Sequence, residues 1–177
     1  MAAKKWPIDT AHSSIQFTVR HMVITKVRGR FRRWDAELSL DDEDVTRSRV
    51  DVSIDAASID TGEEKRDAHL RSADFLDADK YPKITFKTTR VASKGGSALA
   101  VTGDLTIRDV TRPVELEVEN LGKAKDPWGN LKAAFSGKVI INREEFGAKW
   151  NQALETGGVL VGKQVEIDLE LQATAPK

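Results

Sequence analysis

Hydrophobic and polar residues alternate with a period of two along most of this chain. Between Ser14 and His21, for example, Ile15, Phe17 and Val19 are separated by single polar residues. This alternation is typical of a strand with one face buried and one face in water. The same pattern recurs in the ranges 50–56, 99–107, 114–118, 139–141 and 165–171. The pattern therefore predicts a protein built mainly of β-strands.

Two further strands are expected at 29–40 and 84–91, which brings the number to about eight. Eight antiparallel strands are usual for a small closed barrel. Polar or Gly/Pro-containing breaks suited to hairpin turns separate the apolar runs; they lie at 41–44, 93–97, 108–113 and 126–130. Between Phe31 and Trp34 the alternation shifts by one residue, so that the apolar residues move from odd to even positions. This shift predicts a β-bulge that bends the strand. We therefore predict an all-β, eight-stranded antiparallel barrel that forms one domain over residues 1–177.

One segment, residues 60–77, departs from the two-residue period. Thr61 and Glu64 have the spacing of a capping box, in which a hydroxyl and a carboxylate satisfy each other's neighbouring backbone donors. We therefore expect a short helical insert between two strands of the barrel.

The composition of the chain disfavours or excludes several classes of function. The 28 basic and 28 acidic residues cancel, so no long-range field favours nucleic acid or an anionic membrane. The chain has no cysteine, which excludes disulfides, thiol catalysis and cysteine-ligated metals. No apolar run is long enough for a membrane span.

The first residues, Met1 to Ile8, contain two lysines but no apolar stretch of the kind a signal peptide has. We therefore expect a cytoplasmic protein, or a periplasmic one if a leader has been removed. The oligomeric state is open between a monomer and a homodimer.

The three histidines do not have the spacing of a metal site. His12 and His21 are an odd number of residues apart, so on one unbroken strand they would face opposite sides. His69 has no second histidine one turn away, and zinc normally needs three or four converging ligands. We expect no metal. His21 either caps the apolar stripe by bonding to backbone or contacts the headgroup of a ligand.

The densest cationic run is Arg28, Arg30, Arg32 and Arg33. Alternate residues of a strand share a face, so the simpler interpretation is an outward, solvated face. The sharper interpretation is that one of these arginines, such as Arg30, binds a phosphate or carboxylate headgroup at the barrel rim. A nucleic-acid surface is disfavoured because the net charge is zero and no aromatic stacking platform is evident.

No catalytic motif is evident. The chain has no Gly-x-Ser-x-Gly elbow, and its histidines show no local pairing with a serine. The most enzyme-like cluster is Arg66, Asp67 and His69 in the insert. We interpret it as a set of hydrogen bonds that fastens the insert to the barrel, because a polar insert must satisfy its own buried groups. We predict no catalytic residue.

Nine short motifs follow one another in a fixed order over nearly the whole chain. They are Asp9-x-x-His12-Ser13-x-Ile15-x-Phe17-x-Val19-x-His21, Gly29-x-Phe31, Arg66-Asp67-x-His69-Leu70, Asp74-Phe75-Leu76-Asp77, Tyr81-Pro82-x-Ile84-x-Phe86, Gly103-x-Leu105-Thr106-Ile107, Thr111-x-Pro113-Val114-x-Leu116, Trp128-Gly129 and Ile141-Asn142-Arg143-x-x-Phe146-Gly147. Together they resemble the signature of the bacterial YceI-like family. No single motif is decisive, but their order makes the resemblance specific. One departure is Asp109, where the family commonly has glycine in a turn; aspartate also suits turns.

The resemblance implies a lipocalin-like barrel that binds polyisoprenoids or other long amphiphiles, such as fatty-acid-like molecules, and carries or stores them. It implies no other cofactor and no bond-making step. Two rivals stay open: an enzyme that acts on such a lipid, and a barrel filled by its own side chains that serves as an interaction module. The residues that we expect to contact the ligand are Phe17, Val19, His21, Arg30, Phe31, His69, Phe86 and Phe135.

Overall fold

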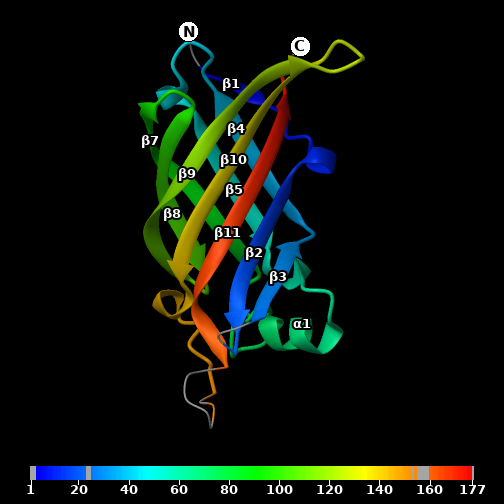
Figure 1. Ribbon diagram of the computed structural model, residues 1–177, viewed down its shortest axis with the longest axis vertical. Coiled ribbons are helices and arrows are strands. Elements are labelled where there is room, and N and C mark those ends of the chain that lie inside the picture. The colour runs from blue at the N-terminus through cyan, green and yellow to red at the C-terminus, as the bar shows by residue number, and fades with distance from the viewer. Residues whose placement is uncertain (1–2, 23–24, 153, 155–159, 177) are drawn as a thin grey trace.

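The computed structural model describes residues 3–22, 25–152, 154 and 160–176. It is mostly antiparallel sheet with one α-helix, α1 (Figure 1). The strands are β1 Lys4–Trp6, β2 Ser14–His21, β3 Thr25–Phe31, β4 Trp34–Leu40, β5 Arg49–Asp55, β6 Ile59–Asp60, β7 Lys83–Gly95, β8 Ala98–Ile107, β9 Val110–Lys125, β10 Leu131–Asn142 and β11 Val161–Thr174. The helix is α1 Glu64–Arg71, and the 3₁₀ turns are η1 Thr10–His12, η2 Val45–Arg47, η3 Ala56–Ser58 and η4 Arg143–Phe146.

The described strands form one curled sheet, in the order β1-β4-β5-β7-β8-β9-β10-β11-β2-β3-β6. The all-β class and the antiparallel barrel are confirmed. The described chain has eleven strands against about eight expected, for two reasons. Strands β1 and β6 have only three and two residues, too few to show an alternation. The single strand expected at 29–40 is two strands, β3 and β4.

The predicted bulge at 32–33 is instead a break at which the chain changes partners. Before it, β3 pairs with β2, and after it, β4 pairs with β5. At the break, Arg32 N donates to Ser58 O at 3.1 Å, and Arg33 O accepts from Asp55 N at 2.9 Å. Phe31 and Trp34 both pack on the interior, which explains the slip in apolar parity.

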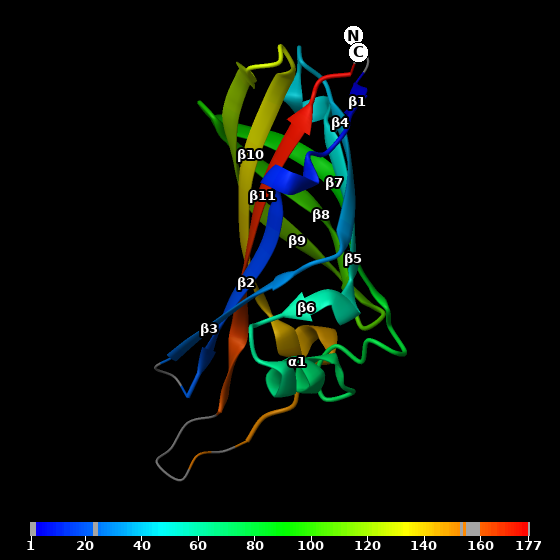
Figure 2. The ribbon, with the colours of Figure 1, turned by 90° about the vertical axis from the view of Figure 1, so that its right-hand side faces the viewer.

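The N-terminal segment bridges the two sides of the barrel at the end opposite α1 (Figure 2). Strand β1 pairs with β4, and the next residues reach β11, where Ile8 bridges Ala173 and Thr174 N donates to Pro7 O at 2.9 Å. Trp6 and Ala173 are both buried there, in a small apolar cluster separate from the main core. The N-terminal segment thus joins β4 to β11, through three residues paired with β4 and the contacts of Pro7 and Ile8 with β11.

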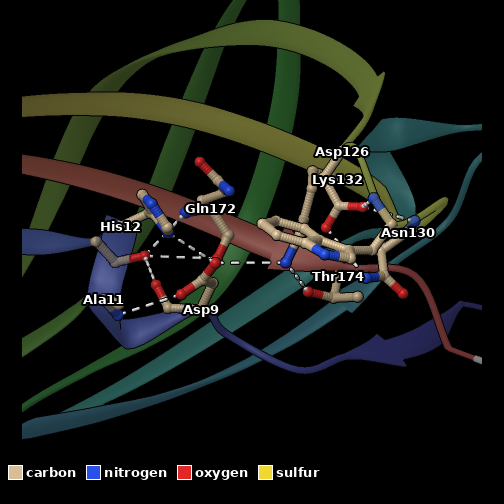
Figure 3. A network of polar contacts seen from close by, with 10 residues as sticks. Asp9, Ala11, His12, Asp126, Asn130, Lys132, Gln172 and Thr174 are labelled. Carbon is tan, nitrogen blue, oxygen red and sulfur yellow. Dashed lines mark hydrogen bonds and ion pairs between the residues drawn. The ribbon is translucent and has the colours of Figure 1, made fainter.

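A polar network secures this seam (Figure 3). The Asp9 carboxylate accepts from Ala11 N at 3.2 Å, from His12 Nδ1 at 2.9 Å and from Lys132 Nζ at 3.3 Å. Lys132 also donates to Thr174 Oγ1 at 2.7 Å. The hydrogen bond from His12 and the bond and charge of Lys132 hold the pKa of Asp9 below its usual value, although partial burial opposes them.

We predict that Asp9→Asn lowers the stability of the protein at neutral pH by about 1 kcal/mol, because asparagine keeps an acceptor oxygen but loses the charge that makes the bond to a charged group stronger than a neutral one. The pKa of Asp9 is lowered by folding, so its contribution is present above the unfolded value of about 3.9 and is lost as pH falls through the lower folded value. Urea unfolding of both proteins at neutral and acidic pH checks this. The difference in the free energy of unfolding should shrink toward about pH 2; a difference independent of pH would contradict the assignment.

The helical insert is confirmed, but the capping box is wrong. The N-cap is Glu63, whose carboxylate accepts from Lys65 N at 3.1 Å and Arg66 N at 2.7 Å. Thr61 precedes the helix and bonds instead to Asp67, one turn inside it. Spacing alone cannot distinguish a capping box of Thr61 and Glu64 from an N-cap at Glu63, because a carboxylate at residue 63 or 64 can reach free backbone donors at a helix start.

Candidate functional site

An apolar cavity of about 190 Å³ lies inside the barrel, toward the end covered by the insert. Its walls come from the inward positions of the strands and from the insert, η4 and Ala148, and every lining side chain but Arg143 is apolar. The lining residues are Ile15, Phe17, Val19, Phe31, Val50, Val52, Ile54, Ile59, Leu70, Phe75, Leu76, Ile84, Phe86, Leu105, Ile107, Val114, Leu116, Val139, Ile141, Arg143, Phe146, Ala148, Val161, Val165, Ile167, Leu169 and Leu171.

Two glycines make room for aromatic rings in the wall. A Cβ atom on Gly29 would lie 2.4 Å from Cζ of Phe17, and one on Gly103 would lie 2.5 Å from Cζ of Phe86. Both distances are far too short for carbon atoms, so any side chain at these two positions would displace the ring. Phe17 also packs on Phe31, with ring centroids 5.7 Å apart.

Five of the predicted ligand contacts are apolar, and four of them line this cavity: Phe17, Val19, Phe31 and Phe86. The fifth, Phe135, lies toward the other end of the barrel. It lines a second apolar cavity of about 70 Å³, together with Leu38, Leu99 and others. The two cavities share Val50 and Leu171, so these side chains form the partition between them.

The three polar residues predicted as ligand contacts lie outside the cavity lining. Arg30 is exposed on the outward face of β3, opposite Asp60 of β6. Its neighbours in the cationic run also point to surface carboxylates, since Arg32 pairs with Asp60 and Arg33 with Asp55. The structure therefore places the cationic run on a solvated face, as in the simpler of the two interpretations.

His21 ends β2 beyond the cavity, opposite Thr25 of β3 and Val161 of β11. Its ring has no hydrogen bond to any residue in the described ranges, so the expected bond to backbone is not seen there. Over the same ranges, no three His, Asp or Glu side chains converge as metal ligands.

His69 lies in α1 and is half-buried between Phe75 and Trp150. Its Nε2 atom lies 2.8 Å from Asp74 Oδ2, and its ring meets Phe75 and Trp150 edge-on, with centroid distances of 5.0 and 4.6 Å. Phe75 and Trp150 also contact each other at 5.5 Å. His69 therefore supports Phe75, which does line the cavity, and does not reach the cavity itself.

Hydrogen bonds within the insert tie α1 to Thr61, which directly follows β6. The buried carboxylate of Asp67 accepts from Thr61 N at 2.9 Å and from the Thr61 hydroxyl. Arg66 donates to the same residue, from Nε to Oγ1 at 2.7 Å and from Nη2 to the carbonyl at 2.9 Å. Because Thr61 lies within residues 60–77, these bonds hold the insert together beside β6, and among the described residues neither Arg66 nor Asp67 bonds to another strand of the barrel.

The β8–β9 turn fastens the insert to the barrel. Arg108 Nη1 donates to the carbonyls of Ala73 and Phe75, both at 2.7 Å. Arg108 and the next residue, Asp109, have φ of 54° and 63°, in the left-handed region that aspartate tolerates better than most residues. Aspartate at this departure from the family pattern is thus compatible with the turn.

Arg143 is a functional candidate for which the sequence pattern predicted no role, although it belongs to one of the family motifs. It begins η4 directly after β10, is only 6% exposed and is the one charged side chain among the lining residues described. Burial lowers the pKa of its guanidinium, and the charge of Glu144 opposes that effect. The sequence signal for this residue is an arginine directly after an apolar strand. The two-residue alternation of that strand does not predict whether a residue in the following 3₁₀ turn is buried.

The fold and the cavity define a class: an antiparallel barrel with an apolar interior and a helical insert across one end. A family model described as the YceI-like domain matches residues 6–173. The chain belongs to the YceI-like family, and the resemblance found in its motifs is confirmed. In the described ranges, no helix is long and apolar enough to cross a membrane.

Individual relatives agree with this assignment. A UPF0312 protein of Vibrio cholerae is 39% identical over 171 residues, which cover 96% of this chain and 85% of the relative. Burkholderia cenocepacia BcnA is similar in structure, with a TM-score of 0.82, 27% identity and coverage of 94% of this chain and 99% of BcnA. A polyisoprenoid-binding domain from Saccharophagus degradans shares the fold, with a TM-score of 0.66, 15% identity and coverage of 97% and 98%.

Proposed function

We propose that this protein binds one long apolar amphiphile, such as a polyisoprenoid or a fatty-acid-like lipid, inside the barrel and carries or stores it without chemical change. The observation that carries the proposal is the cavity, whose lining side chains are all aromatic or aliphatic except Arg143. Each Å² of apolar surface that leaves water contributes about 25 cal/mol. The neighbour from Saccharophagus degradans, described as polyisoprenoid-binding, has the same fold, and its low identity supports the likeness of fold alone.

The size of the cavity defines how a long chain would fit. A volume of about 190 Å³ is below the roughly 300–1,000 Å³ that small-molecule sites usually have. Val50 and Leu171 separate the main cavity from the one beside Phe135. Movement of these two side chains would join the cavities into one channel, so we expect the ligand to widen the barrel interior as it enters.

The insert is suited to a lid. Leu70, Phe75 and Leu76 form part of the cavity wall, whereas Asp67 and Arg66 are bonded to Thr61 outside it. Opening such a segment would admit or release the ligand, as lids do in other proteins. The enzyme rival has less support, because the polar groups of the insert are engaged in hydrogen bonds with each other.

We predict that the protein purified from cells contains a hydrophobic ligand. Native mass spectrometry should show a mass above that of the chain, and organic extraction followed by mass spectrometry should identify the lipid. Extraction of the same buffer passed over an empty column provides the control. Several preparations without any lipid would contradict the proposal and favour a filled barrel that serves as an interaction module.

A further inference from the structure

The buried guanidinium of Arg143 has neutral acceptors but no ion-pair partner among the described residues. Nε donates to Gly162 O at 2.8 Å, Nη1 to Ala148 O at 2.6 Å and Nη2 to Val161 O at 3.3 Å. All three acceptors are neutral carbonyls, and no carboxylate in the described ranges forms an ion pair with this side chain. The adjacent Glu144 is engaged by Lys163 at 3.7 Å.

A guanidinium has five N–H donors, so two remain without an acceptor among the described residues. A buried charge without an ion-pair partner is costly even when some of its donors are bonded, and proteins usually pair such a charge or use it. Here the charge borders an otherwise apolar cavity. The arrangement differs from that of Arg112, which donates from Nε to Glu145 O at 2.9 Å but is exposed and outside the cavity.

The lid covers this charge. The Phe75 ring lies over the guanidinium, with its centroid 5.4 Å from Cζ of Arg143. Phe75 belongs to the insert and is held by Arg108 and His69. A ligand that enters when the insert opens would therefore meet the charge of Arg143 at the mouth and the apolar wall beyond it.

We propose that Arg143 binds the oxyanion headgroup, a carboxylate or a phosphate, of a single-chain amphiphile whose tail extends along the barrel. The proposal rests on the proposed function and specifies the chemistry of its ligand. The planar guanidinium suits both headgroups, since each presents two oxygen atoms to its parallel N–H groups. The tail would run from Phe75 and Phe146 toward Val50 and Leu171, which line the same cavity.

The test compares ligands that differ only in the headgroup. Delipidated wild-type protein is dialysed at pH 8, below the micellar concentration, against radiolabelled hexadecanoate, hexadecyl phosphate or hexadecan-1-ol. We expect at least one of the two anions to bind about tenfold or more tightly than the alcohol, as for a hydrogen bond to a charged group. The stronger anion identifies the headgroup class. If the alcohol binds as tightly as both anions or more tightly, the role of Arg143 is overturned but the proposed function stands. If none of the three ligands binds, both are overturned.

Two variants assign the effect to this side chain. Arg143→Gln should reduce anion affinity to that of the alcohol and change alcohol affinity less than twofold, whereas Arg112→Gln should change neither. If Arg143→Gln does not fold, as judged by circular dichroism, Arg143→Lys keeps the charge and should retain a preference for the anion. A folded Arg143→Gln protein with the wild-type anion preference would overturn the proposal.

Discussion

Purified Phe17→Asp protein is expected to contain no lipid. Phe17 is 8% exposed, lines the cavity and packs on Phe31. An ionised carboxylate there would face an apolar wall, and such a group costs several kcal/mol unless it is paired or protonated. Retention of an apolar tail should therefore be lost, and the free energy of unfolding should fall as well. Extraction with mass spectrometry measures the first effect and urea unfolding measures the second.

Two further variants separate ligand loss from instability. Val19→Trp adds apolar volume to the same wall, so it should fill the cavity and exclude lipid while the carboxylate penalty is avoided. Gln16→Asp places the same carboxylate one residue away, on the exposed face of β2, and should retain the lipid. Retention of lipid at the wild-type level by both cavity variants would show that the ligand does not lie inside the barrel.

Asp67→Ala is expected to speed ligand release and to lower stability together. The substitution leaves the Thr61 N–H and hydroxyl without their acceptor in a largely buried place, which costs about 1–3 kcal/mol. For a chain of this length the melting temperature should fall by roughly 2–4 °C per kcal/mol. Because an untethered insert also opens the mouth of the cavity, the off-rate of bound hexadecanoate should rise. Stopped-flow transfer to acceptor vesicles measures it.

Asp79→Ala is the matched control, because Asp79 is exposed in the segment that follows the helix and has no hydrogen bond or ion pair to a described residue. It should keep the wild-type melting temperature and off-rate. An Asp67→Ala protein that also kept both, but lost turnover of a lipid substrate, would contradict the lid and favour the enzyme rival.

The strands were predictable because a half-buried strand imposes its period of two on the sequence. Phe17, Val19, Phe31 and Phe86 share the inward parity of their strands, and that parity places them on the cavity wall. The same rule puts Arg30 on the outward face of β3, next to Gly29 and Phe31. Parity does not say how far along the barrel a residue lies, which is why Phe135 faces the second cavity and His21 lies beyond the first.

The period of hydrophobic residues and the motif order thus determined the strand content, the insert and the family of this protein. The tertiary structure decided which polar groups meet. Thr61 could pair with Glu64 or with Asp67, and only the packing of the insert selects Asp67. Arg143 belongs to one of the family motifs, but the motif does not say that the side chain is buried. Its burial follows from the segment after η4 and from the start of β11, which place the carbonyls of Ala148, Val161 and Gly162 around it. The local alternation of residues predicts the type of element and the face on which a side chain lies. Burial of a charge depends instead on segments that are distant along the chain.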